Sequence, residues 1–145
     1  MKDNLYKHKL IRIGSVYDGG YFVCPNSIIK ANNLISLGVE TNWEFEKDFL
    51  KTNPKTIITC YDGQTNYKLV LRFFCIQILK TLLLKFNFNL LKRSFNNLFE
   101  YSILLKTKLN FNRKNIGLKN GLSFGEVMSN KENVFLKIDI EGSEY

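Results

Sequence analysis

The chain has 145 residues, a length that suits one domain with a sizeable buried core. Its formal net charge of +8 favours anionic partners such as a lipid surface or another polyanion. Three cysteines with no C-x-x-C pair argue against a disulfide framework and against a zinc site, so we expect no metal and a reducing, cytoplasmic setting.

The first part of the chain predicts a β-hairpin. The apolar run Leu10–Ile13 ends at Gly14, and Asp18-Gly19-Gly20 is a strong turn signal. Tyr21–Cys24 then has the composition of a short strand. Taken alone, these glycines indicate no more than a tight turn between two strands.

A strand, a glycine turn and a helix follow. Leu34–Gly38 is predicted as the first strand of a parallel sheet, and Thr41 with Glu44 three residues later predicts a capping box for the next helix. A turn between a strand and a helix is a common place for a polar or anionic ligand. Gly38 and Glu40 are therefore candidate ligand contacts. The face that this helix turns to the sheet is predicted to carry Phe45, Phe49 and Leu50.

The second strand of the sheet is predicted at Thr56–Tyr61, directly before Asp62. Asp62 stands 24 residues after Gly38. An acid about 20 residues beyond a glycine turn is placed to accept hydrogen bonds from ribose hydroxyls. Asp62-Gly63 is also an ordinary turn signal, but we favour the ribose role.

Residues 67–105 are apolar and basic, with six Lys or Arg residues and one acid, Glu100. The segment predicts two helices separated near Asn87–Asn89, and no stretch has the uncharged length of a membrane span. Two interpretations remain open: a helix pair packed on the core, or a face that contacts a membrane or an acceptor. We favour packing, because the cations do not form one polar stripe. The core-facing stripe would be Leu69, Phe73, Ile76 and Leu83.

The last part of the chain predicts a strand at Leu109–Phe111, a short helix or turn at Leu122–Met128 and a buried strand at Val134–Ile140. Asp139 and Glu141 lie at the carboxyl end of the final strand. Ligands of open α/β sheets bind at that end of the strands, and two carboxylates there are costly to place without a ligand or partner. Gly142 and Ser143 would then begin another helix, with Ser143 as its cap.

The segment Leu136–Glu144 resembles the signature strand of FkbM-type methyltransferases, a branch of the class I S-adenosylmethionine-dependent enzymes. Upstream, the chain resembles a subgroup of that family. The resemblance covers residues 10–62 and 108–145, and the segment between carries no motif of the family. The upstream likeness rests on Arg12–Ser15, Asp18–Tyr21, Leu34–Gly38 and Asn42–Phe49.

The resemblance implies a Rossmann-like class I methyltransferase sheet behind an N-terminal hairpin, with S-adenosylmethionine as cofactor. Gly38, Glu40 and Asp62 would contact the cofactor, and the turn at Asp18 would lie over it. Asp139 and Glu141 would line the methyl-transfer end, and one of them would be the catalytic base that takes the proton of an acceptor hydroxyl. The acceptor would be a hydroxyl of a glycan or a secondary metabolite, and no nucleic acid is expected.

The family's sheet has more strands than this chain supplies. We therefore expect a domain that is incomplete in its C-terminal half, with an exposed apolar edge on the last strand and poor stability on its own. The alternatives to an active enzyme are an inactive methyltransferase fragment and a basic module that docks on a membrane or a polyanion.

Overall fold

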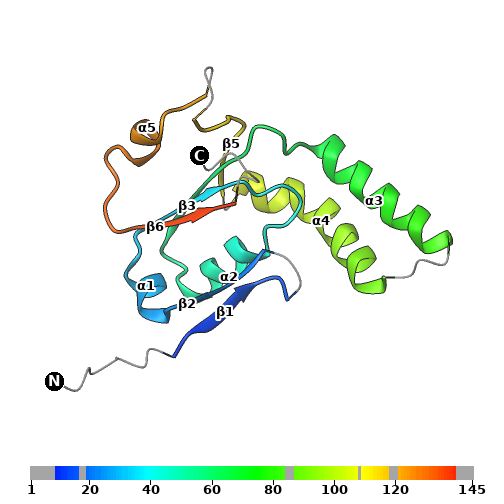
Figure 1. The fold of residues 1–145 in the computed structure, drawn as a ribbon, viewed down its shortest axis with the longest axis horizontal. Helices are drawn as coiled ribbons and strands as arrows, with labels where there is room; N and C mark the ends of the chain where they lie inside the picture. The colour runs from blue at the N-terminus through cyan, green and yellow to red at the C-terminus, as the bar shows by residue number, and fades with distance from the viewer. Residues whose placement is uncertain (1–8, 17–18, 84–86, 108, 118–120, 140–145) are drawn as a thin grey trace.

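A computed structural model describes residues 9–16, 19–83, 87–107, 109–117 and 121–139. Its centre is a four-stranded parallel sheet with the strand order β5-β4-β3-β6, flanked by helices (Figure 1). This is an α/β fold, as the sequence predicted, and it is compatible with a Rossmann-like arrangement. The four strands are β3 (Asn33–Leu37), β4 (Ile57–Tyr61), β5 (Asn110–Asn112) and β6 (Val134–Ile138).

The first strand of the sheet in chain order lies in its interior, and the order in which later strands are added changes direction once. The chain runs from β3 outward through β4 to β5, and then returns to place β6 on the other side of β3. In open α/β folds, such a reversal opens a crevice at the carboxyl ends of the strands. The predicted strands agree with the observed ones to within one or two residues, and Ile140, at the predicted end of the last strand, lies outside the described residues.

One face of the sheet packs against α2 (Glu44–Thr52) through an aromatic core. Phe45 and Phe49 are buried, as predicted, and both rings lie beside Phe135 of β6, at centroid distances of 6.3 and 5.1 Å. The predicted capping box of Thr41 and Glu44 is wrong. The helix begins at Glu44 with Trp43 as its N-cap residue, because the chain first makes a longer turn after Gly38.

The predicted hairpin is present. Strands β1 (Ile11–Gly14) and β2 (Gly20–Val23) pair antiparallel, and β1 contacts α2 at the edge of the same core. Asp18, in the turn between them, lies outside the described residues. Gly14 has a φ of 85°, and a Cβ atom there would stand 2.4 Å from the carbonyl oxygen of Gly19, so the turn requires glycine at this position. The short helix α1 (Pro25–Lys30) joins the hairpin to β3.

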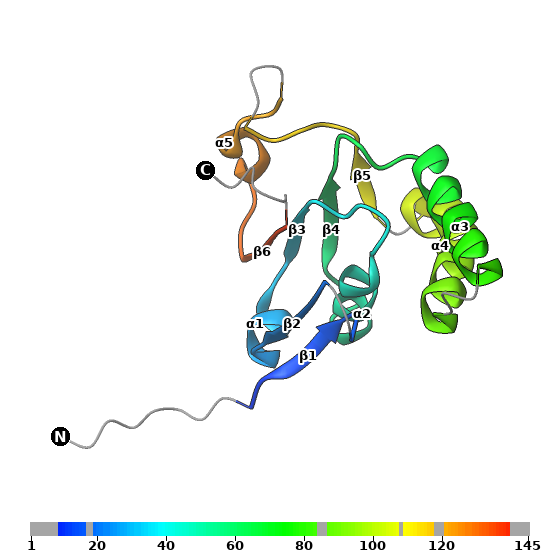
Figure 2. The same cartoon turned by 45° about the vertical axis from the view of Figure 1, so that its right-hand side comes forward.

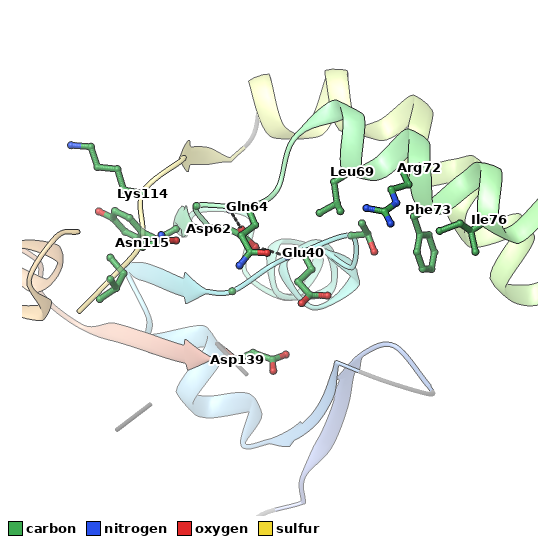
Figure 3. Close-up of a pocket in the computed structure, with 15 residues that line it drawn as sticks. Glu40, Asp62, Gln64, Leu69, Arg72, Phe73, Ile76, Lys114, Asn115 and Asp139 are labelled. Atoms are coloured by element: carbon green, nitrogen blue, oxygen red, sulfur yellow. Dashed lines mark hydrogen bonds between the residues drawn. The ribbon is translucent and has the colours of Figure 1, made fainter. Parts of the chain in front are cut away.

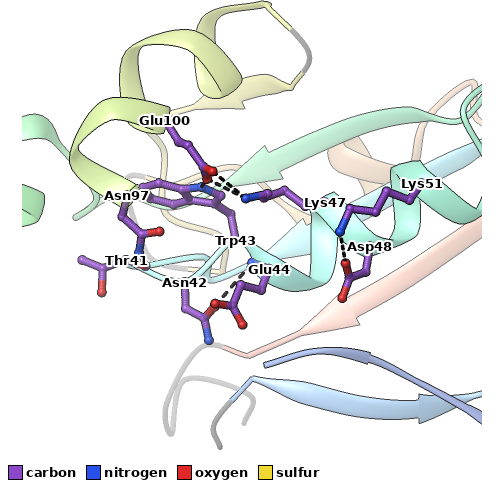
Figure 4. A network of polar contacts seen from close by, with 9 residues as sticks. All are labelled: Thr41, Asn42, Trp43, Glu44, Lys47, Asp48, Lys51, Asn97 and Glu100. Carbon is purple, nitrogen blue, oxygen red and sulfur yellow. Dashed lines mark hydrogen bonds and ion pairs between the residues drawn. The ribbon is translucent and has the colours of Figure 1, made fainter. Parts of the chain in front are cut away.

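Two long helices, α3 (Tyr67–Leu82) and α4 (Phe88–Thr107), stand beyond β5 and pack mainly against each other (Figure 2). A polar network fixes α4 to α2 and to the turn before it (Figure 4). Glu100 accepts hydrogen bonds from Trp43 Nε1 at 3.2 Å and from Lys47 Nζ at 2.7 Å. Asn97 donates to the carbonyl oxygen of Thr41. The only acid of the basic segment therefore holds α4 to the rest of the domain.

The predicted core-facing stripe of α3 is wrong. The helix buries Val70 and Gln77, whereas Ile76 and Leu83 of the predicted stripe are exposed. Apolar residues surround α3 on more than one side, so its hydrophobic pattern does not single out the face that meets α4.

The other face of the sheet is covered by α5 (Phe124–Met128), which begins with a capping box of Ser123 and Glu126. Val127 of this helix packs on Ile35 and Leu37. Within the described part of the chain, β6 pairs only with β3 and forms an edge, where Ile138 is 45% exposed. An exposed strand edge was predicted, and its effect on stability stays a prediction.

Candidate functional site at the carboxyl edge of the sheet

Three of the predicted site residues lie in a row at the carboxyl edge of the sheet. Leu37 pairs in register with Tyr61 on one side and with Ile138 on the other. The next residues of the three strands, Gly38, Asp62 and Asp139, are therefore neighbours. The backbone continues this register, since Gly38 N–H donates to the Tyr61 carbonyl at 3.0 Å and Asp139 N–H donates to the Leu37 carbonyl at 2.8 Å.

Asp62 holds together the two loops that follow β3 and β4. Its Oδ2 accepts the backbone N–H groups of Val39 at 3.0 Å and Glu40 at 2.7 Å. Its Oδ1 accepts those of Gln64 and Thr65, both at 2.8 Å. Burial alone would raise the pKa of Asp62, but these backbone donors outweigh it, and the pKa lies below its usual value. The side chain is therefore an ionised brace.

These hydrogen bonds limit the capacity of Asp62 to accept further hydrogen bonds from a ligand. An ionised carboxylate offers about four acceptor positions, and the four backbone donors occupy them. The ribose contact of Asp62 stays a prediction. A hydroxyl that bound this carboxylate would share an oxygen with a backbone donor.

The turn after β3 is held in a costly conformation. Glu40 has a φ of 47°, a left-handed value that is uncommon outside glycine and costs on the order of 1–3 kcal/mol. Its N–H is bound by Asp62, and its carbonyl oxygen accepts the hydroxyl of Thr65 at 2.8 Å. Gly38, with a φ of 75°, supplies the other left-handed residue of the turn. Contacts on both sides thus fix a strained backbone at the mouth of the site.

Asp139 connects the last strand with the N-terminal hairpin. The hydroxyl of Tyr21, in β2, donates to Asp139 Oδ2 at 3.0 Å, and the Tyr21 ring stacks edge-on against Phe45 at 5.5 Å. The two residues are 118 positions apart in the chain and belong to the two motif regions that carry the family resemblance. The fold therefore brings both motifs to the same place. Glu141 lies outside the described residues.

These groups line a cavity of about 520 Å³ (Figure 3). Glu40, Asp62 and Asp139 form its acidic floor, and Figure 3 shows Asp139 on the side of β6, away from α3. The opposite wall belongs to α3 and is mainly apolar. The wall contributed by α3 consists of Leu69, Arg72, Phe73 and Ile76. The volume of the cavity is within the range of small-molecule sites, about 300–1,000 Å³.

A buried ion pair lies beneath the site. Lys137 of β6 and Glu46 of α2 approach to 3.2 Å, and their side chains are 4% and 0% exposed. Lys137 Nζ also donates to the Gly38 carbonyl at 3.3 Å and lies 5.6 Å from the centre of the Phe45 ring. Glu46 Oε1 also accepts the hydroxyl of Ser36. The pair thus links β6, α2 and the first residue of the turn.

Sequence reasoning placed Gly38, Glu40, Asp62 and Asp139 at the site, and all four line the cavity. It missed Lys137, although a lysine in the middle of an apolar strand is a visible sign of a buried partner. It also missed the contact between Tyr21 and Asp139, for which no local pattern exists. Within the described residues, no cluster of three or more His, Cys, Asp or Glu side chains could hold a metal ion.

No protein-family model, curated protein or solved structure matches the chain. Among the helices of the described ranges, none has the length and apolar character needed to cross a membrane.

Proposed function

We propose that the cavity binds S-adenosylmethionine and that the chain is a class I methyltransferase domain of the FkbM type. The observation that carries this proposal is the alignment of Gly38, Asp62 and Asp139 at one edge of a parallel sheet, around a strained and braced turn. That edge is where open α/β folds bind nucleotide-like ligands. The acidic floor and the apolar wall of the cavity suit a ligand with hydroxyls at one side and a flat ring at the other.

The cavity suggests a division of roles for the cofactor. The apolar side chains Leu69 and Phe73 pack against the adenine ring, and the acidic floor accepts the ribose hydroxyls. Asp62 contributes to that floor and holds the backbone of Val39 and Glu40. Gly38 lets the chain approach the ligand closely, and the Glu40 carboxylate is a further hydroxyl acceptor.

Asp139 is the candidate base for methyl transfer to a hydroxyl of a glycan or secondary metabolite. It takes the proton of the acceptor hydroxyl while the acceptor oxygen bonds to the methyl carbon, and the sulfur of the cofactor keeps the electron pair of the broken C–S bond. The hydrogen bond from Tyr21 fixes one Asp139 oxygen and leaves the other for this proton. Glu141 remains the second candidate.

Calorimetry with S-adenosylmethionine tests the binding site. Asp62→Ala removes a charged acceptor and the brace of the turn, so we expect a loss of roughly 1.5–3 kcal/mol, or about 10- to 150-fold in affinity. Glu132→Gln, an exposed acid outside the cavity, is the control and should keep the affinity of the parent. Unchanged affinity in Asp62→Ala would remove this residue from the site.

A second measurement separates an enzyme from an inactive fragment. Formation of S-adenosylhomocysteine is followed with a panel of sugar and alcohol acceptors. Asp139→Asn should abolish transfer while leaving cofactor affinity within about threefold, because it keeps the shape of the side chain and removes the base. Cofactor binding without transfer to any acceptor would favour the inactive fragment.

A further inference from the structure

The outer side of α3 carries an apolar stripe that meets solvent. Tyr67, Leu71, Cys75, Ile78 and Leu82 follow one another at spacings of four, four, three and four residues, which places them on one side of the helix. All five are exposed, and Leu82 reaches 72%. A stripe with this spacing normally faces a core.

Helix α4 continues the same surface. Phe88, Lys92, Phe95 and Phe99 share one side of the helix and are exposed. The ring of Phe95 lies 4.8 Å from that of Phe99 and 5.8 Å from that of Phe74, a half-buried residue of α3 one turn from Leu71 and Ile78, so the stripe of α4 lies beside that of α3. We call the surface formed by Tyr67, Leu71, Cys75, Ile78, Leu82, Phe88, Lys92, Phe95 and Phe99 the outer face of the helix pair.

The helix pair buries polar residues while it leaves large apolar residues exposed. Gln77, Ser94 and Asn97 are all buried, at 5%, 1% and 4% exposure, on the inner sides of α3 and α4. The outer face exposes leucine, isoleucine and phenylalanine instead. A contiguous apolar surface of this kind on a folded protein marks a contact with another molecule or with a membrane.

The charge of the helix pair favours a membrane over a second copy of the chain as the partner of the outer face. Lys92 belongs to the outer face, and Lys68, next to Tyr67 and one turn from Leu71, is exposed at its margin. The one acid between residues 67 and 107 is Glu100, which is bound to Lys47 and Trp43. A second copy of the chain on this face would oppose two cationic surfaces, which is unfavourable. An anionic lipid surface would neutralise the cations and accept the apolar side chains.

We propose that the outer face of the helix pair docks in the plane of an anionic membrane surface, with both helices parallel to it. The sequence alone favoured packing on the core, and the exposed stripe reverses that preference. The cavity remains open in this arrangement. Leu69 and Ile76 line the cavity, and each lies two residues from an outer-face residue, about 200° around the helix.

Co-sedimentation of the full chain with vesicles tests the proposal. We expect binding to vesicles of phosphatidylcholine with phosphatidylglycerol, weakened by salt, and little binding to phosphatidylcholine alone. Replacing Leu82 and Phe95 together by serine should weaken binding about tenfold or more, because two deeply inserted side chains are lost. The matched control replaces Ile29 and Phe124, which are 62% and 46% exposed on other elements, and should bind like the parent.

The double serine variant could lose binding because it folds poorly, so a second variant removes charge and leaves the apolar side chains in place. Lys68→Gln with Lys92→Gln should weaken binding about fivefold for each charge removed and should reduce its salt dependence. Circular dichroism checks that each variant keeps the helix content of the parent.

A fluorophore shows whether the face enters the lipid. Cys75 is exposed on the outer face, and Cys60 is buried, so a Cys24→Ser chain can be labelled at Cys75. With anionic vesicles, the fluorescence emission of the label should shift to shorter wavelength, and an aqueous quencher should quench it less. Binding without this shift would indicate charge attraction only and would overturn the proposal.

Three further results would also overturn it. They are an absence of binding to anionic vesicles, equal loss of binding in the Ile29 and Phe124 control, and a dimer in light scattering that the Leu82 and Phe95 variant abolishes. The last would show that a second copy covers the face.

Discussion

Removing one partner of the buried pair between Lys137 and Glu46 should destabilise the domain strongly. Lys137→Met would leave the Glu46 carboxylate, 0% exposed in the parent, with Ser36 as its one remaining donor among the described residues, where its Oε2 has no hydrogen-bond partner. Breaking a buried ion pair in this way costs about 3–5 kcal/mol, a large part of the total stability of a small domain. We expect a loss of that size.

Urea denaturation followed by tryptophan fluorescence measures this loss. Trp43 is the only tryptophan in the chain and is 1% exposed, so its emission reports on the same core. Glu46→Leu should cost a similar amount, because it leaves a buried ammonium group. The double variant Glu46→Leu with Lys137→Met should recover most of the loss, since an apolar pair of similar volume is often as stable as a buried ion pair.

The double variant decides whether the reasoning is correct. If its loss equals the sum of the two single losses, the two side chains are not coupled, and the cost comes from repacking alone. A loss below about 1 kcal/mol in Lys137→Met would contradict this reasoning. It would show that the pair contributes as little to the stability of the domain as an exposed ion pair usually does. The matched control is Lys51→Met, whose partner Asp48 forms an exposed pair at 2.8 Å.

Two further predictions concern acid and thiol chemistry. Because the pKa of Asp62 is lowered in the fold, its contribution to stability is complete above the unfolded carboxyl pKa of about 3.9 and is lost as the pH falls below it. Asp62→Asn should therefore flatten the acid side of a stability profile, and an unchanged slope would contradict the brace. Cys75 should react rapidly with a thiol reagent, whereas Cys60, whose pKa is raised mainly by burial, should react only after unfolding. Equal rates in the native protein would contradict this burial.

The strands could be predicted because each is a short apolar run that ends at a recognisable turn residue. β3 and β4 are short runs of buried, largely β-branched or apolar residues, and each ends at a turn residue, Gly38 or Asp62. Once the strands are parallel, their carboxyl ends must lie at one edge. Most of the candidate site follows from that rule without any knowledge of the packing.

The helices were harder to predict, for a physical reason. The start of α2 depends on the path of the turn after Gly38, which is set by Asp62 and by Asn97 of α4. Neither contact is local to the helix. The face of α3 was predicted wrongly because burial there depends on how α4 returns along it, and apolar residues are present on several sides. Periodicity finds an amphipathic helix only when one side is polar.

The way in which the turn after β3 is held supports our proposal that the carboxyl edge is a binding site. Three distant side chains hold it: Asp62 binds the N–H groups of Val39 and Glu40, Thr65 binds the Glu40 carbonyl, and Lys137 binds the Gly38 carbonyl. A turn that only joins a strand to a helix needs no such support and would avoid a left-handed glutamate. Fixing a strained backbone before a ligand arrives lowers the cost of ordering it on binding. The buried lysine and the braced carboxylate are thus parts of one arrangement, which keeps the mouth of the cavity in a single shape.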